Sequence, residues 1–431
     1  MLDIRFIREN SEKVQQAAQS KGYNVSIAEL LKLDDERRSL QQQVDELREK
    51  RNMNAAKMKN GKPEQSSIDE GKQIKIELAE REGYLTNTDA KFAELLKRVP
   101  NMPWNDVPFG ASEDENVEVK VVGEKPQFDF TPKNHYEIAE AKGWLDKERA
   151  AKVAGARFAY VMGDLVKLQL AIEHFVIDTL TDETVLKKIT DEAKLNVSTR
   201  PFVPVLPPLM IRTESYDQMD RLEPRDDRYK IEGEELWLQG SAEHVLGSMH
   251  AGEIFEAEQL PLRYLGFATS FRKEAGTYGK DMEGLIRMHQ FDKLEMESFT
   301  TGEKGFDEHL FFIAIQEYLL QQLGLPYHVL LKCTADIGKP NARGVDMEVW
   351  LPGQGKYRET HTADYMTDYQ ARRLNTRVRA ENGLELIHTN DATAFALGRA
   401  MVAIIENHQT AEGDVRVPEV LRPYIVGREI L

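Results

Sequence analysis

Residues 260–296 read LPLRYLGFATSFRKEAGTYGKDMEGLIRMHQFDKLEM, and this stretch decides the fold. Residues 261–271 are rich in aromatic and β-branched side chains, and residues 286–296 alternate between apolar and polar, so both segments are typical of β-strands. The glycines and charges of residues 275–284 separate the two segments and predict a loop. The sequence therefore predicts two strands joined by a loop.

Charged and aromatic side chains gather on these two strands. Because alternate residues of a strand share a face, we expect Arg272 and Glu274 to lie together where the first strand ends. An arginine fork suits phosphate oxygens, an aromatic face suits a base and a carboxylate accepts from an amine, so the pattern predicts a nucleotide site. An exposed hairpin with solvated charges is equally compatible with the pattern alone. The second strand contributes Arg287, His289, Phe291, Lys293 and Glu295 to one face.

The order of residues in this stretch resembles a known motif. Phe-Arg-Lys-Glu, a glycine-rich loop and then Arg-Met-His-Gln-Phe-Asp-Lys-Leu-Glu are similar to the second signature motif of class II aminoacyl-tRNA synthetases, in the form that seryl-tRNA synthetases have. The resemblance extends over essentially the whole chain. It implies an α+β fold in which residues 1–104 form an antiparallel two-helix coiled-coil arm that binds tRNA. Residues 105–431 would form the class II catalytic domain, an antiparallel sheet flanked by helices.

Composition narrows the class of protein. A chain of 431 residues, 41% hydrophobic and 30% charged, can hold two or three globular domains. No apolar run approaches the ~18 residues of a membrane helix, and the N-terminus resembles neither a signal nor a transit peptide, so we expect a cytoplasmic protein without membrane contact. The single cysteine, Cys333, excludes an internal disulfide and a multi-cysteine zinc site. A net charge of −16 argues against a generic nucleic-acid coat but permits a local basic patch.

Two heptad series near the N-terminus predict the arm. Apolar positions recur at 3-4 spacing over residues 30–58 and again over residues 74–99, and residues 60–63 end the first helix. Two such helices make an antiparallel rod about 50 Å long. A solvated or dimerising rod and an arm that contacts nucleic-acid backbone both fit. The resemblance implies the second, with tRNA(Ser), and also tRNA(Sec), as partner. The half far from the termini is basic, with Arg48, Lys50, Arg51, Lys57, Lys59 and Lys62 against Glu49 alone.

Several other segments have expected structures. Residues 1–26 predict one short helix, residues 105–122 an acidic connection, residues 156–162 a strand and residues 164–180 an amphipathic helix. Residues 202–210 are apolar and punctuated by prolines, which suits a sheet edge or an interface. They resemble the first class II motif, which implies a homodimer; a buried connection is the alternative. Further along we expect a helix over residues 305–323, strands over residues 327–331 and 346–351, and a last helix that opens within residues 388–399.

Three short motifs are candidate site elements. A hydroxyl and a carboxylate two residues apart, Ser241 and Glu243, could receive a hydroxyl and an ammonium group, although such tripeptides are common in helix N-caps. Glu359 and Thr362 are an oxygen pair suited to Mg²⁺, although polar loops often look like this. Arg399, near a helix start, favours phosphate. All three motifs depart slightly from the family's usual Thr-Ala-Glu, Glu-Ile-Ser-Ser and Thr-Leu-Asn-Gly-Ser-Gly.

The resemblance implies a role for each candidate residue. The catalytic residues would be Arg272, Glu274 and Arg399. The residues that bind serine would be Ser241, Ala242, Glu243, Arg272, Glu295 and Thr393. The residues that bind ATP would be Arg272, Lys273, Glu274, Met288, His289, Gln290, Phe291, Glu359, Thr360, His361, Thr362 and Arg399. The residues that bind Mg²⁺ would be Glu359 and Thr362; one histidine beside one carboxylate argues against a transition-metal site at His361.

The implied function is that of a serine–tRNA ligase. Such an enzyme activates serine with ATP to seryl-adenylate and transfers the seryl group to the 3′ end of tRNA(Ser). Two other classes stay open: a ligase that charges a non-tRNA acceptor, and a non-catalytic protein that has kept the fold. The intact arm argues against the first. Retention of Arg272, Glu274, Glu295, Glu359 and Arg399 argues against the second.

Overall fold

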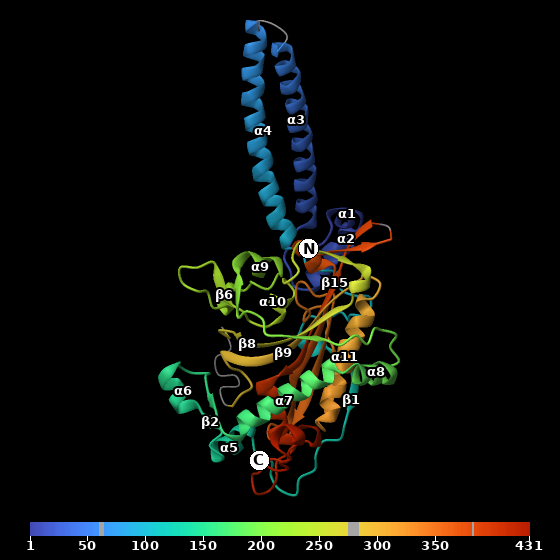
Figure 1. Cartoon of the computed structure of the whole chain (residues 1–431). Coiled ribbons are helices and arrows are strands. Elements are labelled where there is room, and N and C mark those ends of the chain that lie inside the picture. The colour runs from blue at the N-terminus through green and yellow to red at the C-terminus, as the bar shows by residue number, and fades with distance from the viewer. Residues whose placement is uncertain (60–63, 275–283, 382) are drawn as a thin grey trace. The chain divides into compact units, whose positions relative to one another are not determined.

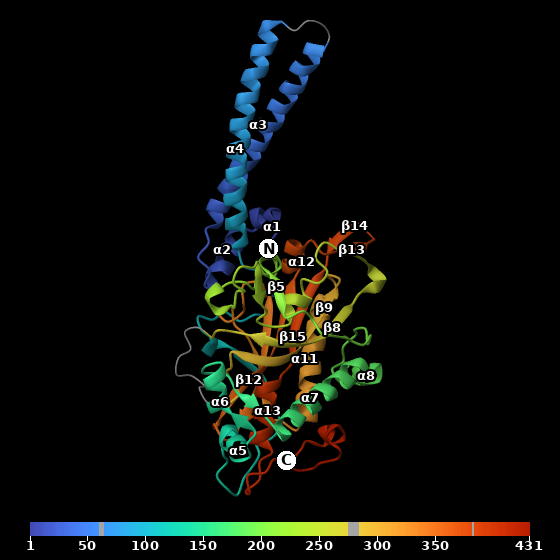
Figure 2. The ribbon, with the colours of Figure 1, turned by 60° about the vertical axis from the view of Figure 1, so that its left-hand side comes forward.

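The computed structural model describes residues 1–59, 64–274, 284–381 and 383–431 (Figures 1 and 2). The chain divides into two compact units, Met1–Met102 and Pro103–Leu431. The expected end of the first arm helix at residues 60–63 and most of the expected loop at residues 275–284 lie outside the described residues. Within the described part, no helix combines the length and the apolar character needed to cross a membrane.

The first unit is a pair of long helices with two short ones at its base. The helices are α1 (Ile4–Glu9), α2 (Ser11–Ser20), α3 (Ile27–Lys59) and α4 (Gln65–Lys97). Both α3 and α4 have 33 residues, which corresponds to about 50 Å. Arg48 bonds to Glu82 and Asn54 bonds to Glu70, so the two helices run antiparallel. The predicted coiled coil is confirmed. The single helix expected before it is wrong, because the chain breaks at Asn10 between α1 and α2.

A carboxylate is buried where α1 meets α3. The side chain of Asp34 has no exposed surface, and its oxygens lie 2.6 Å from Arg8 Nη2, 3.0 Å from Arg37 Nη2 and 3.4 Å from Arg38 Nε. Burial acts to raise the pKa of Asp34, but the hydrogen bonds from Arg8 and Arg37 outweigh it and lower that pKa. Each carboxylate oxygen of Asp34 therefore has at least one arginine partner within the protein.

The second unit is built on one eight-stranded sheet. Every neighbouring pair is antiparallel except β4 and β8, which run parallel. This is the antiparallel sheet flanked by helices that the sequence predicts. In spatial order the strands are β1 (Val117–Val122), β10 (Tyr327–Leu331), β11 (Arg343–Leu351), β12 (Lys356–Thr367), β15 (His388–Ala396), β9 (Gln290–Thr300), β8 (Leu262–Phe271) and β4 (Val203–Val205).

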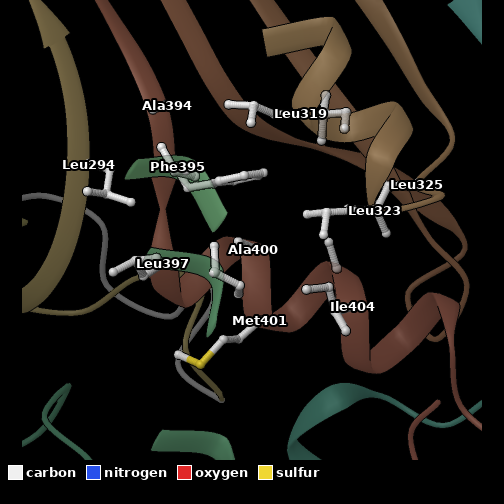
Figure 3. Close-up of a cluster of buried hydrophobic side chains, with 14 of the residues drawn as sticks. Leu294, Leu319, Leu323, Leu325, Ala394, Phe395, Leu397, Ala400, Met401 and Ile404 are labelled. Carbon is white, nitrogen blue, oxygen red and sulfur yellow. The ribbon is translucent and has the colours of Figure 1, made fainter. Parts of the chain in front are cut away.

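Three helices cover one face of this sheet and form the core with it: α7 (Asp164–Thr181), α11 (Gly305–Gln322) and α13 (Leu397–Asn407). Figure 3 shows Leu294 of β9 and Phe395 of β15 in one cluster with Leu319 of α11 and Ile404 of α13. Because side chains alternate along a strand, burying Leu294 here leaves Lys293 and Glu295 on the opposite face. The candidate site residues Lys293 and Glu295 therefore lie on the face of the sheet that the three helices do not cover.

Smaller elements complete the unit. The short helices and strands are α5 (His135–Ala141), β2 (Leu145–Asp146), α6 (Lys147–Val153), β3 (Tyr160–Val161), α8 (Glu183–Glu192), β5 (Met210–Arg212), α9 (Thr213–Gln218), β6 (Leu236–Leu238), α10 (Glu243–Leu246), β7 (Ile254–Glu256), α12 (Tyr369–Leu374), β13 (Arg377–Ala380) and β14 (Gly383–Leu386). The 3₁₀ turns are η1 (Glu113–Glu115), η2 (Arg225–Asp227), η3 (Ala257–Gln259) and η4 (Glu419–Ile425).

The structure corrects three sequence-based expectations. Residues 388–396 are strand β15 and do not open the last helix, which begins at Leu397. The acidic connection at residues 105–122 contains the edge strand β1, and the strand expected at residues 156–162 shrinks to β3. Pairing with distant strands decides these segments and overrides local composition. The helix expected at residues 164–180 is confirmed as α7, with its predicted apolar face buried.

Candidate functional site

One pocket lies where β8 and β9 meet the start of α13, and it encloses about 660 Å³ of empty space, its open mouth included. Gly398 forms part of its wall, and an added Cβ there would lie only 3.0 Å from the backbone oxygen of Leu285, so the close approach favours glycine. The lining is Arg272, Glu274, Leu285, Ile286, Arg287, Met288, Phe291, Lys293, Glu359, Thr360, Thr362, Thr393, Ala396, Gly398 and Arg399.

A β-bulge brings Glu359 and Thr362 to the same side. In a regular strand two residues three positions apart point to opposite faces. Here the pairing of β12 with β11 shifts at Thr360, because Glu359 and His361 pair with successive residues of β11. Thr360 is the extra residue of the bulge, and Glu359 and Thr362 therefore both line the pocket.

A second bulge on the neighbouring strand has the same effect. Thr393 and Phe395 of β15 pair with successive residues of β9, which leaves Ala394 as the extra residue. Thr393 and Ala396 consequently both reach the pocket, while Phe395 packs into the core. The buried ring of His361 links the two bulges, because its Nε2 lies 2.9 Å from Ala394 O. Burial lowers the pKa of His361 to about 3, so its ring is neutral at pH 7.

Each arginine of the pocket is held by an acceptor. Arg272 Nε donates to Gly240 O at 2.9 Å, and its guanidinium carbon lies 5.4 Å from the centre of the Phe291 ring. Arg287 Nη1 lies 2.5 Å from Glu274 Oε2. Arg399 Nη1 lies 2.8 Å from Glu359 Oε1. These partners fix three guanidinium groups around one cavity, an arrangement suited to a polyanionic ligand.

Oxygen atoms near Arg399 fit a magnesium ion. Burial acts to raise the pKa of Glu359, but the charges of Arg399 and Lys332 outweigh it and lower that pKa to about 2, so the carboxylate is ionised. The Thr362 hydroxyl is buried opposite Asp346 and makes no hydrogen bond of regular geometry with the residues that the structure describes. One carboxylate and one hydroxyl suit Mg²⁺, which takes its other ligands from phosphate and water. Among the described residues no group of three or more His, Cys, Asp or Glu could enclose a metal by itself.

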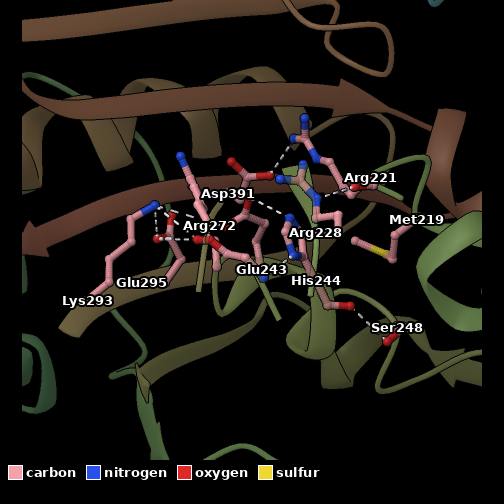
Figure 4. A network of polar contacts seen from close by, with 12 residues as sticks. Met219, Arg221, Arg228, Glu243, His244, Ser248, Arg272, Lys293, Glu295 and Asp391 are labelled. Carbon is pink, nitrogen blue, oxygen red and sulfur yellow. Dashed lines mark hydrogen bonds and ion pairs between the residues drawn. The ribbon is translucent and has the colours of Figure 1, made fainter. Parts of the chain in front are cut away.

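A second polar cluster lies next to the pocket (Figure 4). Lys293 Nζ contacts Glu295 Oε2 and lies 3.1 Å from Ser241 Oγ and 4.0 Å from Glu243 Oε2. Ser241 and Glu295 have no exposed surface. Two buried oxygens of the cluster, Glu243 Oε2 and Glu295 Oε1, accept no hydrogen bond from the described residues. Unused acceptors in a buried place are costly unless a ligand supplies donors.

Neighbouring charges set the protonation of this cluster. Burial acts to raise the pKa of Glu243, but His244 and Lys293 outweigh it and hold that pKa well below its usual value. Burial raises the pKa of Glu295 to about 7, although the charge of Lys293 opposes the rise. Burial lowers the pKa of His244 to about 4. Glu243 is therefore the ionised carboxylate, and Glu295 titrates near neutral pH.

More buried charge lies behind this cluster. Arg221 Nη2 is 3.2 Å from Asp391 Oδ2, which faces Glu297 across β15 and β9. Neither carboxylate oxygen of Glu297 has a hydrogen-bond partner among the described residues. Burial, together with the charges of Asp391 and Glu243, raises the pKa of Glu297 well above its usual value. These surroundings favour the protonated form of Glu297.

The structure brings most of the predicted site residues together but leaves some outside the pocket. Lys273 is exposed, 5.5 Å from the Tyr229 ring centre, and Gln290 lines a neighbouring depression. His289 Nδ1 is 3.0 Å from Arg272 O, so His289 supports the backbone of Arg272. The buried His361 ring packs against Phe395, 4.9 Å between ring centres, and does not line the pocket. Ala242 is buried in apolar packing. The residues that line the pocket are Arg272, Glu274, Met288, Phe291, Glu359, Thr360, Thr362, Thr393 and Arg399; Ser241, Glu243 and Glu295 form the adjoining cluster.

Sequence reasoning assigned no role to Arg287 and Lys293. It did predict that both share a face with Phe291 and Glu295, which is the signal that could have identified them. Arg287 and His289 precede β9 rather than lying within it, since β9 begins at Gln290. The bulges at Thr360 and Ala394 gave no signal in the sequence.

Comparisons with known proteins assign the family. The model of the seryl-tRNA synthetase N-terminal domain matches residues 1–103, and the model of the tRNA synthetase class II core domain (G, H, P, S and T) matches residues 228–408. The chain is 40% identical to the serine–tRNA ligase of Deinococcus radiodurans, over 100% of this chain and 99% of that one. It is 41% identical to that of Methanocella arvoryzae, over 100% of both. The chain belongs to the seryl-tRNA synthetase family.

Solved structures agree with this assignment. The seryl-tRNA synthetase from Pyrococcus horikoshii complexed with ATP has a TM-score of 0.89 and 36% identity, covering 100% of this chain and 99% of that one. The cytoplasmic serine–tRNA ligase from Naegleria fowleri in complex with AMP has a TM-score of 0.85 and 26% identity, covering 100% and 98%. The predicted fold, family and enzyme class, a serine–tRNA ligase, are thereby confirmed, and the non-catalytic alternative falls.

Proposed function

We propose that this enzyme activates serine with ATP and transfers the seryl group to tRNA in two steps. Residues 105–431 carry the activation step and residues 1–104 bind the tRNA. The observation that carries the proposal is the convergence of Arg272, Glu274 and Arg399 on one pocket, with the cluster of Ser241, Glu243 and Glu295 beside it. A pocket suited to a polyanion thus lies directly beside a cluster suited to an ammonium group.

Activation joins serine to the nucleotide at that border. A serine carboxylate oxygen attacks the α-phosphorus of ATP, a bond to that phosphorus forms, and the bond to the bridging oxygen breaks as pyrophosphate leaves. Arg272, whose Nε is anchored to Gly240 O, can hold both the α-phosphate and the serine carboxylate. No protein nucleophile takes part; Cys333 is buried and donates to Ser112 O. Positioning and charge neutralisation supply the catalysis.

The remaining pocket residues hold the nucleotide. Phe291 offers its ring to the adenine, and Glu274 accepts from the adenine amine while Arg287 fixes its carboxylate. Arg399 takes the γ-phosphate. Glu359 and Thr362 would hold Mg²⁺, and the bound ion would neutralise negative charge of the phosphates. The ATP complex of the Pyrococcus horikoshii relative supports the choice of nucleotide.

Serine is recognised by its ammonium and hydroxyl groups. Glu243 receives the ammonium group, and Ser241, Glu295 and Thr393 surround the hydroxyl. A site built to hydrogen-bond a substrate hydroxyl rejects the analogue that lacks it by ~10⁴ or more. Alanine is therefore excluded by unpaired polar groups, and threonine by the size of the pocket.

The acceptor binds through the arm. Lys50, Arg51 and Lys57 are exposed on α3 in an otherwise acidic protein, which suits backbone contacts with tRNA(Ser). Such contacts follow shape and charge, so tRNA(Sec) is a second acceptor. Two further proposals are a cytoplasmic location and a homodimer. Val203 and Leu206, near the edge strand β4, are 51% and 81% exposed, an apolar patch that a second subunit would cover.

The Arg272→Ala variant tests the activation step. Loss of the guanidinium removes stabilisation at the α-phosphate, so serine-dependent pyrophosphate exchange should fall at least ~10³-fold while the fold is kept. Arg225→Ala, which removes an exposed arginine paired with Glu223, should leave exchange unchanged. Exchange retained by the Arg272 variant would refute its role.

The charge of the arm tests the transfer step. Changing Lys50, Arg51 and Lys57 to Gln should raise the KM for tRNA roughly 10-fold or more and leave pyrophosphate exchange intact, because phosphate contacts act additively. The matched control changes Lys32 and Lys91, two exposed lysines nearer the base of the arm, in the same way. Equal effects of the two sets would contradict binding at the far half. A wild-type protein that exchanges pyrophosphate but charges no tRNA would favour a non-tRNA acceptor.

A further inference from the structure

The ammonium group of Lys293 lies within the cluster of Ser241, Glu243 and Glu295 that is proposed to bind serine. The side chain of Lys293 is 8% exposed, and its Nζ contacts Glu295 Oε2 and lies 3.1 Å from Ser241 Oγ and 4.0 Å from Glu243 Oε2. Figure 4 shows Lys293 and Glu295 together at this point, with Arg272 and Glu243 close by. The partners of Lys293 are thus the groups proposed to bind the ammonium and hydroxyl groups of serine.

Lys293 also borders the nucleotide pocket. Its side chain lines that pocket together with Arg272 and Thr393. A lysine carries a compact charge on a flexible four-carbon stem, so its ammonium can change partners without movement of the backbone. Because Lys293 lies in the middle of the sheet, on β9 between β8 and β15, its backbone is held by both neighbours. The side chain alone can move between the two sites.

The acceptors around Lys293 exceed what one ammonium can satisfy. Glu243 Oε2 and Glu295 Oε1 accept no hydrogen bond in the described structure. The α-ammonium of an amino acid has three donors and the same charge as a lysine ammonium. The two groups therefore compete for the same carboxylates. Serine cannot contact Glu243 and Ser241 fully while Lys293 stays between them.

We propose that Lys293 is a stand-in for the substrate ammonium, filling the amine position of the empty enzyme and moving to the nucleotide side when serine binds. This inference rests on the proposed function of the same site. Lys293 neutralises the buried carboxylates before the substrate arrives, since an unpaired buried charge is strongly destabilising. Once serine displaces it, the Lys293 ammonium faces the nucleotide pocket, on the side where Arg272 is proposed to hold the α-phosphate. Serine binding and ATP binding then favour one another, which is a positive coupling between two sites.

A pair of ligands tests the stand-in role in the full-length protein without ATP. The ligands are serine and 3-hydroxypropanoate, which is serine without its amine, and their affinities are measured by calorimetry for the wild type and for Lys293→Met. Serine should bind the variant about tenfold more tightly, because its competitor is gone. The deaminated analogue should bind the variant about tenfold more weakly, because nothing then neutralises Glu243. These opposite shifts are the expected result.

Controls separate this role from a structural one. Lys339 is also part-buried, with its Nζ 2.7 Å from Asp220, and Lys339→Met should change neither affinity. Lys293→Arg keeps a cation and should restore binding of the analogue. If both ligands bind Lys293→Met more weakly, or if neither affinity changes, the stand-in role is overturned. Pyrophosphate exchange by the wild type tests the proposed function separately: its absence would refute that function, whereas exchange together with parallel shifts would refute only the role of Lys293.

Discussion

Two regions of the molecule bury carboxylates, and they do so in different ways. In the arm, Asp34 is fully buried and both of its oxygens meet arginines. In the catalytic unit, Glu243 and Glu295 are also buried, yet each keeps one buried oxygen that no described residue bonds to, and Glu297 keeps two. A buried carboxylate that the protein satisfies by itself stabilises the fold. One that it leaves partly unsatisfied is available to a ligand, at a cost to stability.

The largest expected effect concerns Glu243. Glu243→Gln keeps the shape of the side chain and removes its charge, so kcat/KM for serine in pyrophosphate exchange should fall about 10³-fold, the size expected for an electrostatic contact with substrate. The free energy of unfolding should fall by less than it does in Asp34→Asn, because Glu243 Oε2 accepts no hydrogen bond from the described residues whereas both oxygens of Asp34 meet arginines. A large loss of stability in urea denaturation would break the comparison.

Asp34→Asn should show the opposite pattern. Three arginines would lose their common counter-ion, and we expect about 2 kcal/mol lower unfolding free energy, a value reduced because the arginines are part-exposed. Serine-dependent exchange should be unchanged. Because the folded-state pKa of Asp34 is lowered, its contribution is present at neutral pH and is lost as the pH falls through that lowered pKa. Denaturation of wild type and variant at pH 7 and in acid measures both effects.

Glu295 sharpens the comparison through pH. Its pKa is raised to about 7, so in the empty enzyme it is largely protonated at pH 6 and ionised at pH 8. The ammonium of serine favours the ionised form; serine affinity should therefore rise a few-fold between these values, with proton release on binding. The folding stability shows the opposite trend. The pKa of Glu295 is higher in the folded state than the ~4.3 of the unfolded chain, so its protonation contributes fully to the free energy of unfolding below pH ~4.3. This contribution is lost as the pH rises through about 7. Calorimetry in two buffers detects the proton, and Glu295→Gln should abolish its release.

The smallest effect is expected at Glu297. Its surroundings raise its pKa and favour the protonated form, and neither of its oxygens accepts a hydrogen bond from the described part of the chain. Glu297→Gln should therefore change the free energy of unfolding by less than about 1 kcal/mol at pH 7. A change as large as that of Asp34→Asn would mean that an unsatisfied buried carboxylate can also hold the fold together.

Local periodicity correctly predicted those helices and strands whose structure depends mainly on residues nearby in the sequence. The heptads gave α3 and α4, and alternation gave β8 and β9. It failed for β15, whose Asn, Asp and Ala residues have low strand propensity and are held in the sheet by β9 and β12 on either side. It also failed for β1, an edge strand that pairs with a segment some two hundred residues away in the chain.

The sequence predicted which residues form the site better than it predicted how those residues are arranged. Spacing and resemblance together selected Arg272, Glu274 and Arg399, which the structure brings to one pocket. The partners that hold them, such as Arg287 on Glu274, could not be read from the sequence, because ion pairs join residues across a fold without a local pattern. The position of Lys293 in the amine cluster depends on the same long-range packing.

The bulges on β12 and β15 have a consequence for how densely chemistry can be arranged. A flat strand offers a cavity one side chain about every 6.6 Å, since only alternate residues face it. At Thr360 two consecutive residues, Glu359 and Thr360, reach the same cavity, whereas the bulge at Ala394 lets Thr393 and Ala396 both reach it. Removing Thr360 would restore a plain strand that still points Glu359 and Thr362 inward. The segment from Glu359 to Thr362 would then be one residue shorter with both end residues still facing the cavity. The cavity would lose the polar side chain of Thr360 from its lining.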